Sequence, residues 1–145
     1  MSGVIVGIDG SHHSSRALDW AMSEAALRNA ELTVITVHSV PASPWSGRPV
    51  TFPSDADTVD QIRKSAQDAV NKAADALGDH QPKSVQVLAA NGFPAKILVD
   101  TSASADLLVV GSRGGGGFGT LLLGSVASQV VHHAKCPVVV VPADR

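Results

Sequence analysis

The sequence predicts an α/β protein in which a parallel sheet carries helices on both faces. Short apolar segments alternate four times with segments of helical spacing, and a fifth apolar segment follows. Such alternation is typical of parallel sheets, because each crossover helix packs back onto the sheet. The predicted strands are continuous apolar runs, which indicates burial on both faces. With 145 residues, of which 44% are hydrophobic and 17% charged, the chain is expected to form one domain, residues 1–145.

The first half of the chain is predicted to contain two strands, two helices and a long loop. Residues 4–8 are an apolar run that ends in a turn, and residues 12–28 place apolar side chains at helical spacing. Residues 32–40 are β-branched and apolar, which predicts the second strand. Residues 41–57 are rich in proline, so a long loop is expected, and long loops are usually functional or mobile. Apolar spacing over residues 59–77 then predicts an amphipathic helix.

The second half repeats the alternation and ends in a strand. An apolar run at 84–89 predicts the third strand, and a proline opens the helix at 94–102, since proline suits a first helical position. Apolar residues at 107–110 predict the fourth strand. Helical spacing resumes at 125–133, and the valines at 138–141 predict the fifth strand.

Three aromatic residues are notable for their positions. Trp20 falls within the first predicted helix and is expected in or near the core. Trp45 and Phe52 fall within the proline-rich loop, where they either form a lid or partner surface or fold back onto the edge of the domain. The sequence leaves both possibilities open.

The glycine-rich segment 111–119 follows the fourth strand directly and leads toward the fourth helix. In open α/β sheets ligands bind at the carboxyl edge, where this segment lies. Glycine lets backbone amides approach a ligand closely, and successive amides form a concave anion site. The helix that begins after Gly124 adds free N–H groups and the positive end of its dipole. Together these features suit a phosphate chain, the alternative being a plain flexible turn.

Two well-known phosphate motifs do not fit this segment. A P-loop would require a lysine directly before Ser125, and that position holds Gly124. Gly114, Gly116 and Gly119 match the spacing of a dinucleotide fingerprint. They follow the fourth strand, however, and the next strand ends in Pro142 instead of an acidic ribose ligand.

The spacing of the glycines is informative beyond these motifs. Two residues separate Gly111 from Gly114, and nine separate Gly114 from the pair Gly124 and Ser125. This pattern resembles the ATP-binding signature of the universal stress protein family. The resemblance covers the whole chain and extends to the segments 6–11, 37–38, 92–94, 106–114, 123–126 and 136–138.

The resemblance implies a five-stranded parallel sheet of order 3-2-1-4-5, ATP binding and homodimers. By position, Gly7, Ile8 and Asp9 would meet the adenosine portion, and Ser39 and Val40 would line the adenine pocket. The ribose and phosphates would be held by Gly111, Ser112, Arg113, Gly114, Gly115, Gly116, Gly117, Gly124, Ser125 and Val126.

The candidate residues can hold a nucleotide but lack the groups that cleave one. Phosphoryl transfer usually needs a lysine on the phosphates and a metal-binding acid, and Asp9 is the one acid at the expected edge. Ser125 could share in Mg²⁺ binding through the phosphates. The resemblance implies an ATP-binding regulatory protein of the stress response. From the residues themselves we predict no catalytic residues and at most slow hydrolysis. The alternatives are an interaction module with a degenerate nucleotide site and an FMN-type redox module.

Bulk properties restrict the partners and the compartment. A formal net charge of -2, with no run of Lys and Arg, disfavours nucleic acid as a partner. No apolar run reaches the length of a membrane span, and the chain does not open with the pattern of a signal peptide. Cys136 is the one cysteine, so no internal disulfide is possible. These observations lead us to expect a cytoplasmic protein without a membrane partner.

The last predicted strand has a consequence for assembly. In the implied order, Val138–Val141 lies at an edge of the sheet. A long apolar edge tends to recruit another chain. Pairing with its twin across a two-fold axis would satisfy that edge, so a homodimer built on this strand is expected.

Overall fold

The structure is a computed structural model that describes residues 3–113 and 123–142. Its strands are β1 (Val4–Ile8), β2 (Glu31–Ser39), β3 (Ser84–Gly92), β4 (Leu107–Gly111) and β5 (Val138–Val141). Its helices are α1 (His12–Arg28), α2 (Ser54–Leu77), α3 (Pro94–Ser102) and α4 (Ser125–His133). Strand and helix alternate along the chain, as the sequence predicts.

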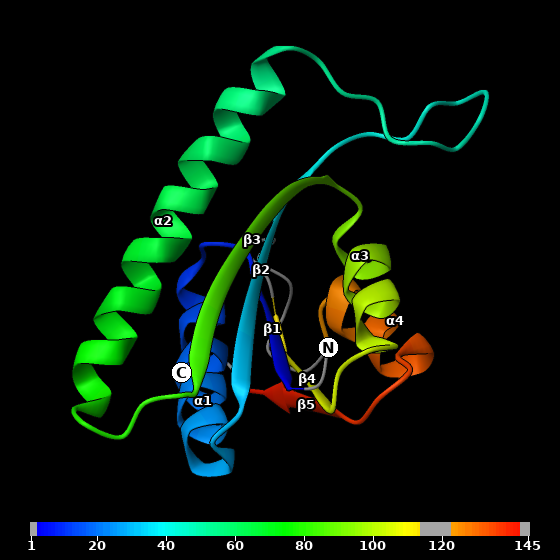
Figure 1. Cartoon of the computed structure of the whole chain (residues 1–145). Coiled ribbons are helices and arrows are strands. Elements are labelled where there is room, and N and C mark those ends of the chain that lie inside the picture. The colour runs from blue at the N-terminus through cyan, green and yellow to red at the C-terminus, as the bar shows by residue number, and fades with distance from the viewer. Residues whose placement is uncertain (1–2, 114–122, 143–145) are drawn as a thin grey trace.

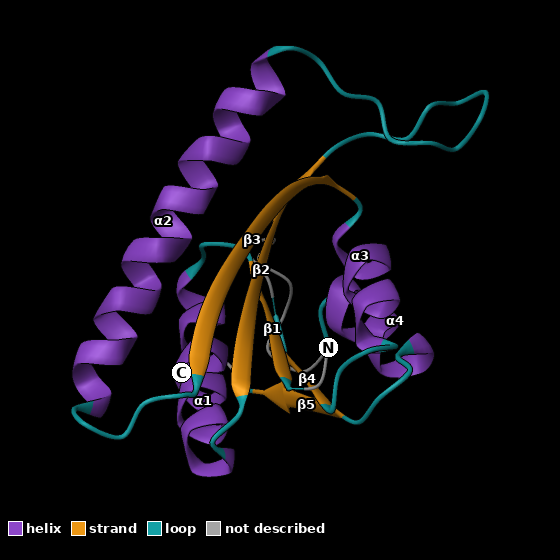
Figure 2. Cartoon of the chain, in the orientation of Figure 1, coloured by secondary structure: helices purple, strands orange, loops and turns teal. Residues whose placement is uncertain are grey.

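All neighbouring strands pair in parallel, and the sheet has the order β3-β2-β1-β4-β5. The predicted fold class is therefore confirmed. Figure 1 shows α1 and α2 on one side of the sheet and α3 and α4 on the other, and Figure 2 shows the strands as the middle layer. The carboxyl ends of the five strands meet at one edge, because all of them run in the same direction.

Two apolar cores form, one on each face of the sheet. On the α1 and α2 face, Val6, Val34 and Val109 pack against α1 residues such as Met22. On the α3 and α4 face, Ile5 and Leu108 belong to a second cluster, which also contains side chains of the two short helices. Successive residues of a strand point to opposite faces, so continuous apolar runs supply both cores.

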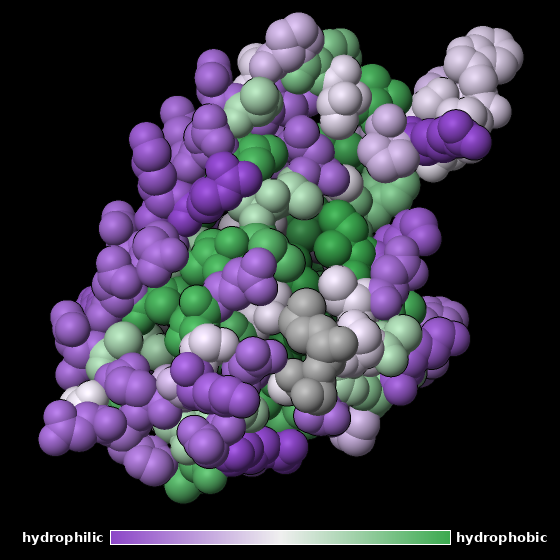
Figure 3. Space-filling view, viewed as in Figure 1, coloured by the Kyte–Doolittle hydropathy of each residue, from purple (hydrophilic) through white to green (hydrophobic). Residues whose placement is uncertain are grey.

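The interpretation of apolar strands as buried on both faces is wrong for β3. Val85 and Leu88 are 36% and 37% exposed, because β3 lies at an edge of the sheet and has β2 as its partner. Figure 3 shows apolar surface in the middle of the view, where Figure 1 places β3, beside the polar outer side of α2. The expectation for Trp20 is also wrong. Its side chain is 37% exposed, because it lies on α1 at the margin of the buried stripe of Ala17, Ala21 and Met22.

Some boundaries differ from the sequence prediction. β3 extends to Gly92, because its last residues continue the ladder with β2 through Ser39. α2 begins at Ser54, so the loop after β2 ends sooner than predicted. Its first turn carries Asp55 and Asp57, which complement the positive end of the helix dipole. That first turn has no apolar periodicity, and for this reason the apolar pattern did not mark it.

Within the described residues, no helix combines the length and the apolar character needed to cross a membrane.

Candidate functional site

A cleft of about 640 Å³ opens at the carboxyl edge of the sheet, between the strand ends and helices α3 and α4. The chain order reverses between β1 and β4, since β2 and β3 lie beyond β1 and β5 lies beyond β4. Ligand sites of open α/β sheets lie at such a reversal. The cleft is therefore in the position that this architecture reserves for a ligand.

Most of the predicted site residues line this cleft. They are Gly7, Ile8, Asp9, Ser39, Gly111, Arg113, Gly124, Ser125 and Val126. Val40 and Ser112 are neighbours of cleft residues but do not line it. Gly114, Gly115, Gly116 and Gly117 lie outside the described residues. The structure thus brings the ends of β1, β2 and β4 together with the start of α4.

The sequence interpretation missed one wall of the cleft. This wall consists of Phe93 and the first residues of α3, and the floor continues along β2 through Ile35 and Val37. A signal for the floor was present, because Ile35 and Val37 lie four and two residues before Ser39 and so point to the same face of the sheet. Lys96 on α3 and Gln129 on α4 are further polar residues of the cleft that were not predicted.

Gly7 is required by the packing of the cleft floor. A Cβ atom built on Gly7 would lie 2.7 Å from Cδ1 and 3.0 Å from Cδ2 of Leu98. Leu98 is 3% exposed and belongs to the core beneath the cleft. The glycine therefore lets the Leu98 side chain of α3 pack directly against the backbone of β1 at the cleft floor.

Asp9 is held in the turn between β1 and α1. Its Oδ1 accepts a hydrogen bond from the backbone N–H of Ser11 at 2.9 Å. The hydroxyl of Ser14 accepts from the Asp9 N–H at 3.4 Å and donates to the Ser11 carbonyl at 3.0 Å. A side-chain oxygen bonded two residues on is the geometry of an Asx-turn. Asp9 is exposed and borders the cleft, so this turn also places a carboxylate at its edge.

The start of α4 is tied to the sheet. Gly124 donates its N–H to the Ser112 carbonyl at 2.7 Å, and Ser112 donates its own N–H to the Val141 carbonyl at 2.9 Å. Gly124 is the N-cap of α4 and provides no side-chain cap. The first-turn amides of a helix have no partner inside the helix. In α4 these amides belong to Ser125, Val126 and Ala127, all of which line the cleft.

A second helix also begins at the cleft. Pro94 occupies the first turn of α3, and the N-cap residue Phe93 makes no side-chain cap. Lys96 lies in the same turn, and its Nζ pairs with Asp100 Oδ2 at 3.0 Å. Arg113 also lines the cleft, so its lining combines two cations and two helix N-termini with apolar strand residues. Such a combination suits a ligand with an apolar part and an anionic part.

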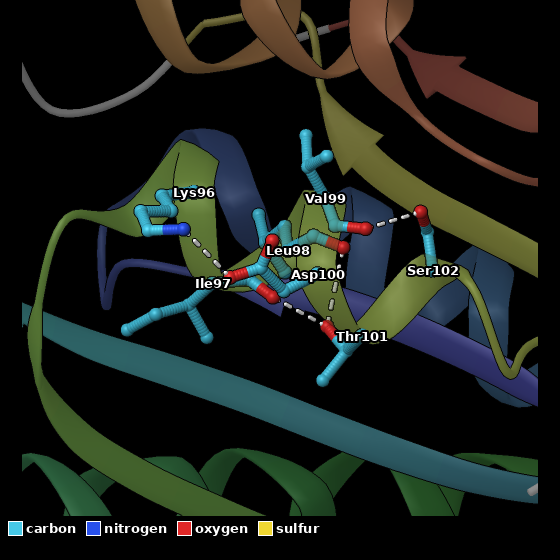
Figure 4. A network of polar contacts seen from close by, with 7 residues as sticks. All are labelled: Lys96, Ile97, Leu98, Val99, Asp100, Thr101 and Ser102. Carbon is cyan, nitrogen blue, oxygen red and sulfur yellow. Dashed lines mark hydrogen bonds and ion pairs between the residues drawn. The ribbon is translucent and has the colours of Figure 1, made fainter.

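Polar side chains brace α3 along its length (Figure 4). Thr101 Oγ1 donates to the carbonyls of Ile97 and Leu98 at 2.6 and 3.1 Å, and Ser102 Oγ donates to the Val99 carbonyl at 2.6 Å. Ser102 Oγ also accepts the N–H of Lys135 at 2.8 Å. This last bond joins the end of α3 to the segment after α4, so the two helices that flank the cleft are held to each other.

A His–Asp pair fixes the segment that follows β2. His38 Nε2 lies 2.9 Å from Asp55 Oδ1, and the N–H of Phe52 donates to Asp55 Oδ2 at 2.6 Å. The hydrogen bond from Phe52, followed by that from His38 and its charge, outweighs desolvation and holds the pKa of Asp55 below its ordinary value. The end of β2 and the start of α2 are thereby clamped together beside the cleft.

Among residues 3–113 and 123–142, His, Cys, Asp and Glu side chains form no cluster that could hold a metal ion. Cys136 lies away from the cleft lining, and its Sγ donates to the Pro137 carbonyl at 3.4 Å. Burial, with a contribution from the negative charge of Asp106, raises the pKa of this thiol. The raised pKa favours the neutral thiol over the nucleophilic thiolate.

The fold and the cleft define a class: a doubly wound α/β protein with a ligand cleft at the reversal point of its sheet, flanked by two helix N-termini. A model of the Universal stress protein family matches residues 1–142. The chain belongs to the universal stress protein family, as its glycine spacing predicted.

Curated relatives agree with this assignment. A universal stress protein of Mycolicibacterium smegmatis is 35% identical over 142 residues, which are 98% of this chain and 48% of that protein. Universal stress protein Rv2005c of Mycobacterium tuberculosis is 36% identical over the same shares of the two chains. The chain thus spans about half the length of the curated relatives that it matches.

Solved structures share the architecture. The universal stress protein UspA from Lactobacillus plantarum superposes with a TM-score of 0.76 at 24% identity, covering 97% of each chain. A crystal structure of a universal stress protein in complex with cAMP superposes with a TM-score of 0.68 at 30% identity, covering 99% of this chain and 98% of that one.

Proposed function

We propose that this protein binds an adenine nucleotide in the cleft, with ATP as the physiological ligand, and acts as a regulatory protein of the stress response. The observation that carries the proposal is the cleft itself, where a helix N-terminus without a side-chain cap faces the reversal point of the sheet. Family membership and the 30% identical neighbour in complex with cAMP support it.

In this proposal the nucleotide lies across the cleft from β2 to α4. Ser39 borders the base, while the buried Val40 supports the adenine pocket from behind. Gly7, Ile8 and Asp9 lie beside the adenosine portion. The phosphates lie against Gly111, Arg113 and the α4 amides of Ser125 and Val126, with the segment 114–117 completing the cradle. Ser112 acts through the backbone by holding Gly124. Mg²⁺ would bind through the phosphates, since carboxylates that could hold it alone are not gathered in the described part of the chain.

Thermal unfolding with added nucleotide tests the site. At 100 times the dissociation constant, ATP should stabilise the fold by about 2.7 kcal/mol. Gly124→Val places a side chain at the N-cap of α4 and should abolish this shift while the protein still folds. Arg113→Gln should weaken ATP more than AMP, because it removes a cation near the phosphates. The matched control is Arg63→Gln on α2, where the guanidinium pairs with Asp60 away from the cleft. If Gly124→Val kept the full shift, the phosphate site would be misplaced.

Hydrolysis is expected to be slow or absent. The cleft lining has Asp9 as its one carboxylate within the described residues, and Asp9 already accepts the Ser11 amide. Phosphoryl transfer draws on a phosphate-binding lysine, metal-binding acids and a group that orients the nucleophile. Release of phosphate at several turnovers per second would contradict this part of the proposal.

The edge of β5 is the proposed dimer contact. Within the described residues β5 pairs with β4 alone, so its outer edge offers unpaired backbone groups. A two-fold axis at this edge would join two sheets and cover the apolar strand in a cytoplasmic homodimer. Sedimentation at micromolar concentration should give twice the mass of the chain, and a monomer would refute this contact.

A further inference from the structure

An aromatic side chain in the segment that follows the cleft residue Ser39 is almost wholly uncovered. Trp45 is 95% exposed, although the chain is poor in aromatic residues. Trp45 lies in the segment between β2 and α2, which Figure 1 shows projecting toward the side of the sheet that carries α3 and α4. An indole is costly to expose, since it is a large apolar group. Its exposure leaves the indole free of packing against the domain and available for a contact with a ligand.

The segment around Trp45 is a small hairpin with its own hydrogen bonds. Ala42 and Pro49 form an antiparallel bridge, Ser43 donates its N–H to the Arg48 carbonyl at 2.7 Å, and Val50 donates to the Pro41 carbonyl at 2.9 Å. In the described part of the chain, the hydrogen bonds of residues 41–50 join members of this segment to each other. The hairpin is therefore stiff in itself and is not tied to the surface of the domain.

Both ends of the hairpin are anchored at the cleft. On one side, Val40 is buried and donates its N–H to the Gly92 carbonyl at 3.3 Å, directly before the cleft residue Phe93. On the other side, Phe52 is held by Asp55, which pairs with His38. The freedom to move is thus confined to the two short links at 40–41 and 50–52. From these links, an extended strand of five residues reaches roughly 15 Å, so a rotation about the links moves Trp45 through a long arc.

The cleft lining could cover one face of a bound base, and the indole could cover the other. At the end where β2 leads into the hairpin, the described lining includes Val37, Ser39, Phe93 and Pro94. A base bound there would rest on these residues from below and have its second face open to water. Aromatic side chains stack on bases whatever their sequence, because every base has a π-face.

We infer that Trp45 is a base-contacting residue: the hairpin 41–50 swings about its two links and stacks the indole on the outer face of the bound adenine. This inference rests on the proposed nucleotide binding, and it adds to the site a mobile hairpin that covers the base. It also gives Trp45 a role in selecting ligands with a base over sugar phosphates without one.

Fluorescence tests the motion, because the chain has two tryptophans. Trp20→Phe leaves Trp45 as the single emitter, and Trp45→Phe leaves Trp20, which lies on α1 away from the cleft lining. AMP should quench or blue-shift the Trp45 emission along the same saturation curve that calorimetry gives, and it should leave the Trp20 emission unchanged. Ribose 5-phosphate, which lacks a base, should leave both unchanged.

Affinity tests the contact. Trp45→Ala should raise the Kd for AMP about tenfold and leave that for ribose 5-phosphate unchanged, and Trp45→Phe should restore most of the loss. The unfolding midpoint of the free protein should not move, since the side chain is exposed. If AMP binds the wild type by calorimetry while Trp45 emission stays constant, or if Trp45→Ala binds AMP normally, the lid is refuted and the nucleotide site stands. If no AMP binds the wild type at all, the proposed function fails and the lid fails with it.

Discussion

Replacing Gly7 by alanine tests whether the close approach of α3 to β1 sets the cleft floor. The new methyl group would lie 2.7 Å from Cδ1 of Leu98, closer than carbon atoms pack. Leu98 is buried at 3% exposure and has little room to yield, so Gly7→Ala should cost about 1–3 kcal/mol by overpacking. Leu98→Ala alone should cost about 2–5 kcal/mol, because it leaves a cavity in the core beneath the cleft.

The double variant is the informative measurement. Leu98→Ala removes the atoms that the methyl group introduced by Gly7→Ala would strike, and this methyl group fills part of the space they leave. The two costs should therefore not add, and the double variant should be more stable than their sum by about 1–3 kcal/mol. Urea unfolding, read as the change in midpoint at constant slope, measures each free energy. Gly7→Ala combined with Val70→Ala, which lies in the core on the opposite face, provides the additive control. If the costs of Gly7→Ala and Leu98→Ala add to within about 0.5 kcal/mol, the contact between the two residues has no energetic role.

Three further outcomes follow from single contacts. Ser102→Ala should destabilise the fold by about 1–3 kcal/mol in urea unfolding, because it leaves the N–H of Lys135 without its buried acceptor, whereas an unchanged midpoint would mean that water replaces the bond. Because the fold lowers the pKa of Asp55 from its ordinary value of 3.8, the ionised carboxylate stabilises the fold at pH values above 3.8. This stabilisation is lost as the pH falls through the folded-state pKa. Asp55→Asn should therefore lose less stability than the wild type between about pH 5 and about pH 2, and parallel curves would show that the bond from Phe52 has no such effect. Because burial raises the pKa of Cys136, its reaction with Ellman's reagent near neutral pH should be slower than that of the unfolded chain, and equal rates would contradict the assignment.

Much of the fold could be predicted because the local signals agree with the tertiary structure. Pro94 marks the start of α3, and Ser125 marks the start of α4, each at the residue observed. The start of α2 was missed because its first turn is stabilised by the acidic pair Asp55 and Asp57, which apolar spacing does not report. Trp20 was misplaced because helical spacing alone does not fix which way a large side chain at the margin of the buried stripe points.

The site residues that belong to a sequence motif could be predicted, whereas those that line the cleft because of tertiary packing could not. The strand ends at Gly7 and Gly111 and the start of α4 followed from glycine spacing and family resemblance. The α3 wall, with Phe93 and Lys96, did not, because it depends on how closely one helix approaches the sheet. That approach depends on the packing of Leu98 against Gly7. The two residues are 91 positions apart, so no local sequence pattern indicates their contact.

The two hydrogen bonds through Ser112 have a further consequence for how this protein can vary. They link the residue that follows β4 to the N-cap residue of α4, Gly124, and to the last residue of β5, Val141. Ser112 and Gly124 are thus held together through backbone hydrogen bonds, so side-chain substitutions at either residue should leave the junction of β4, β5 and α4 in place.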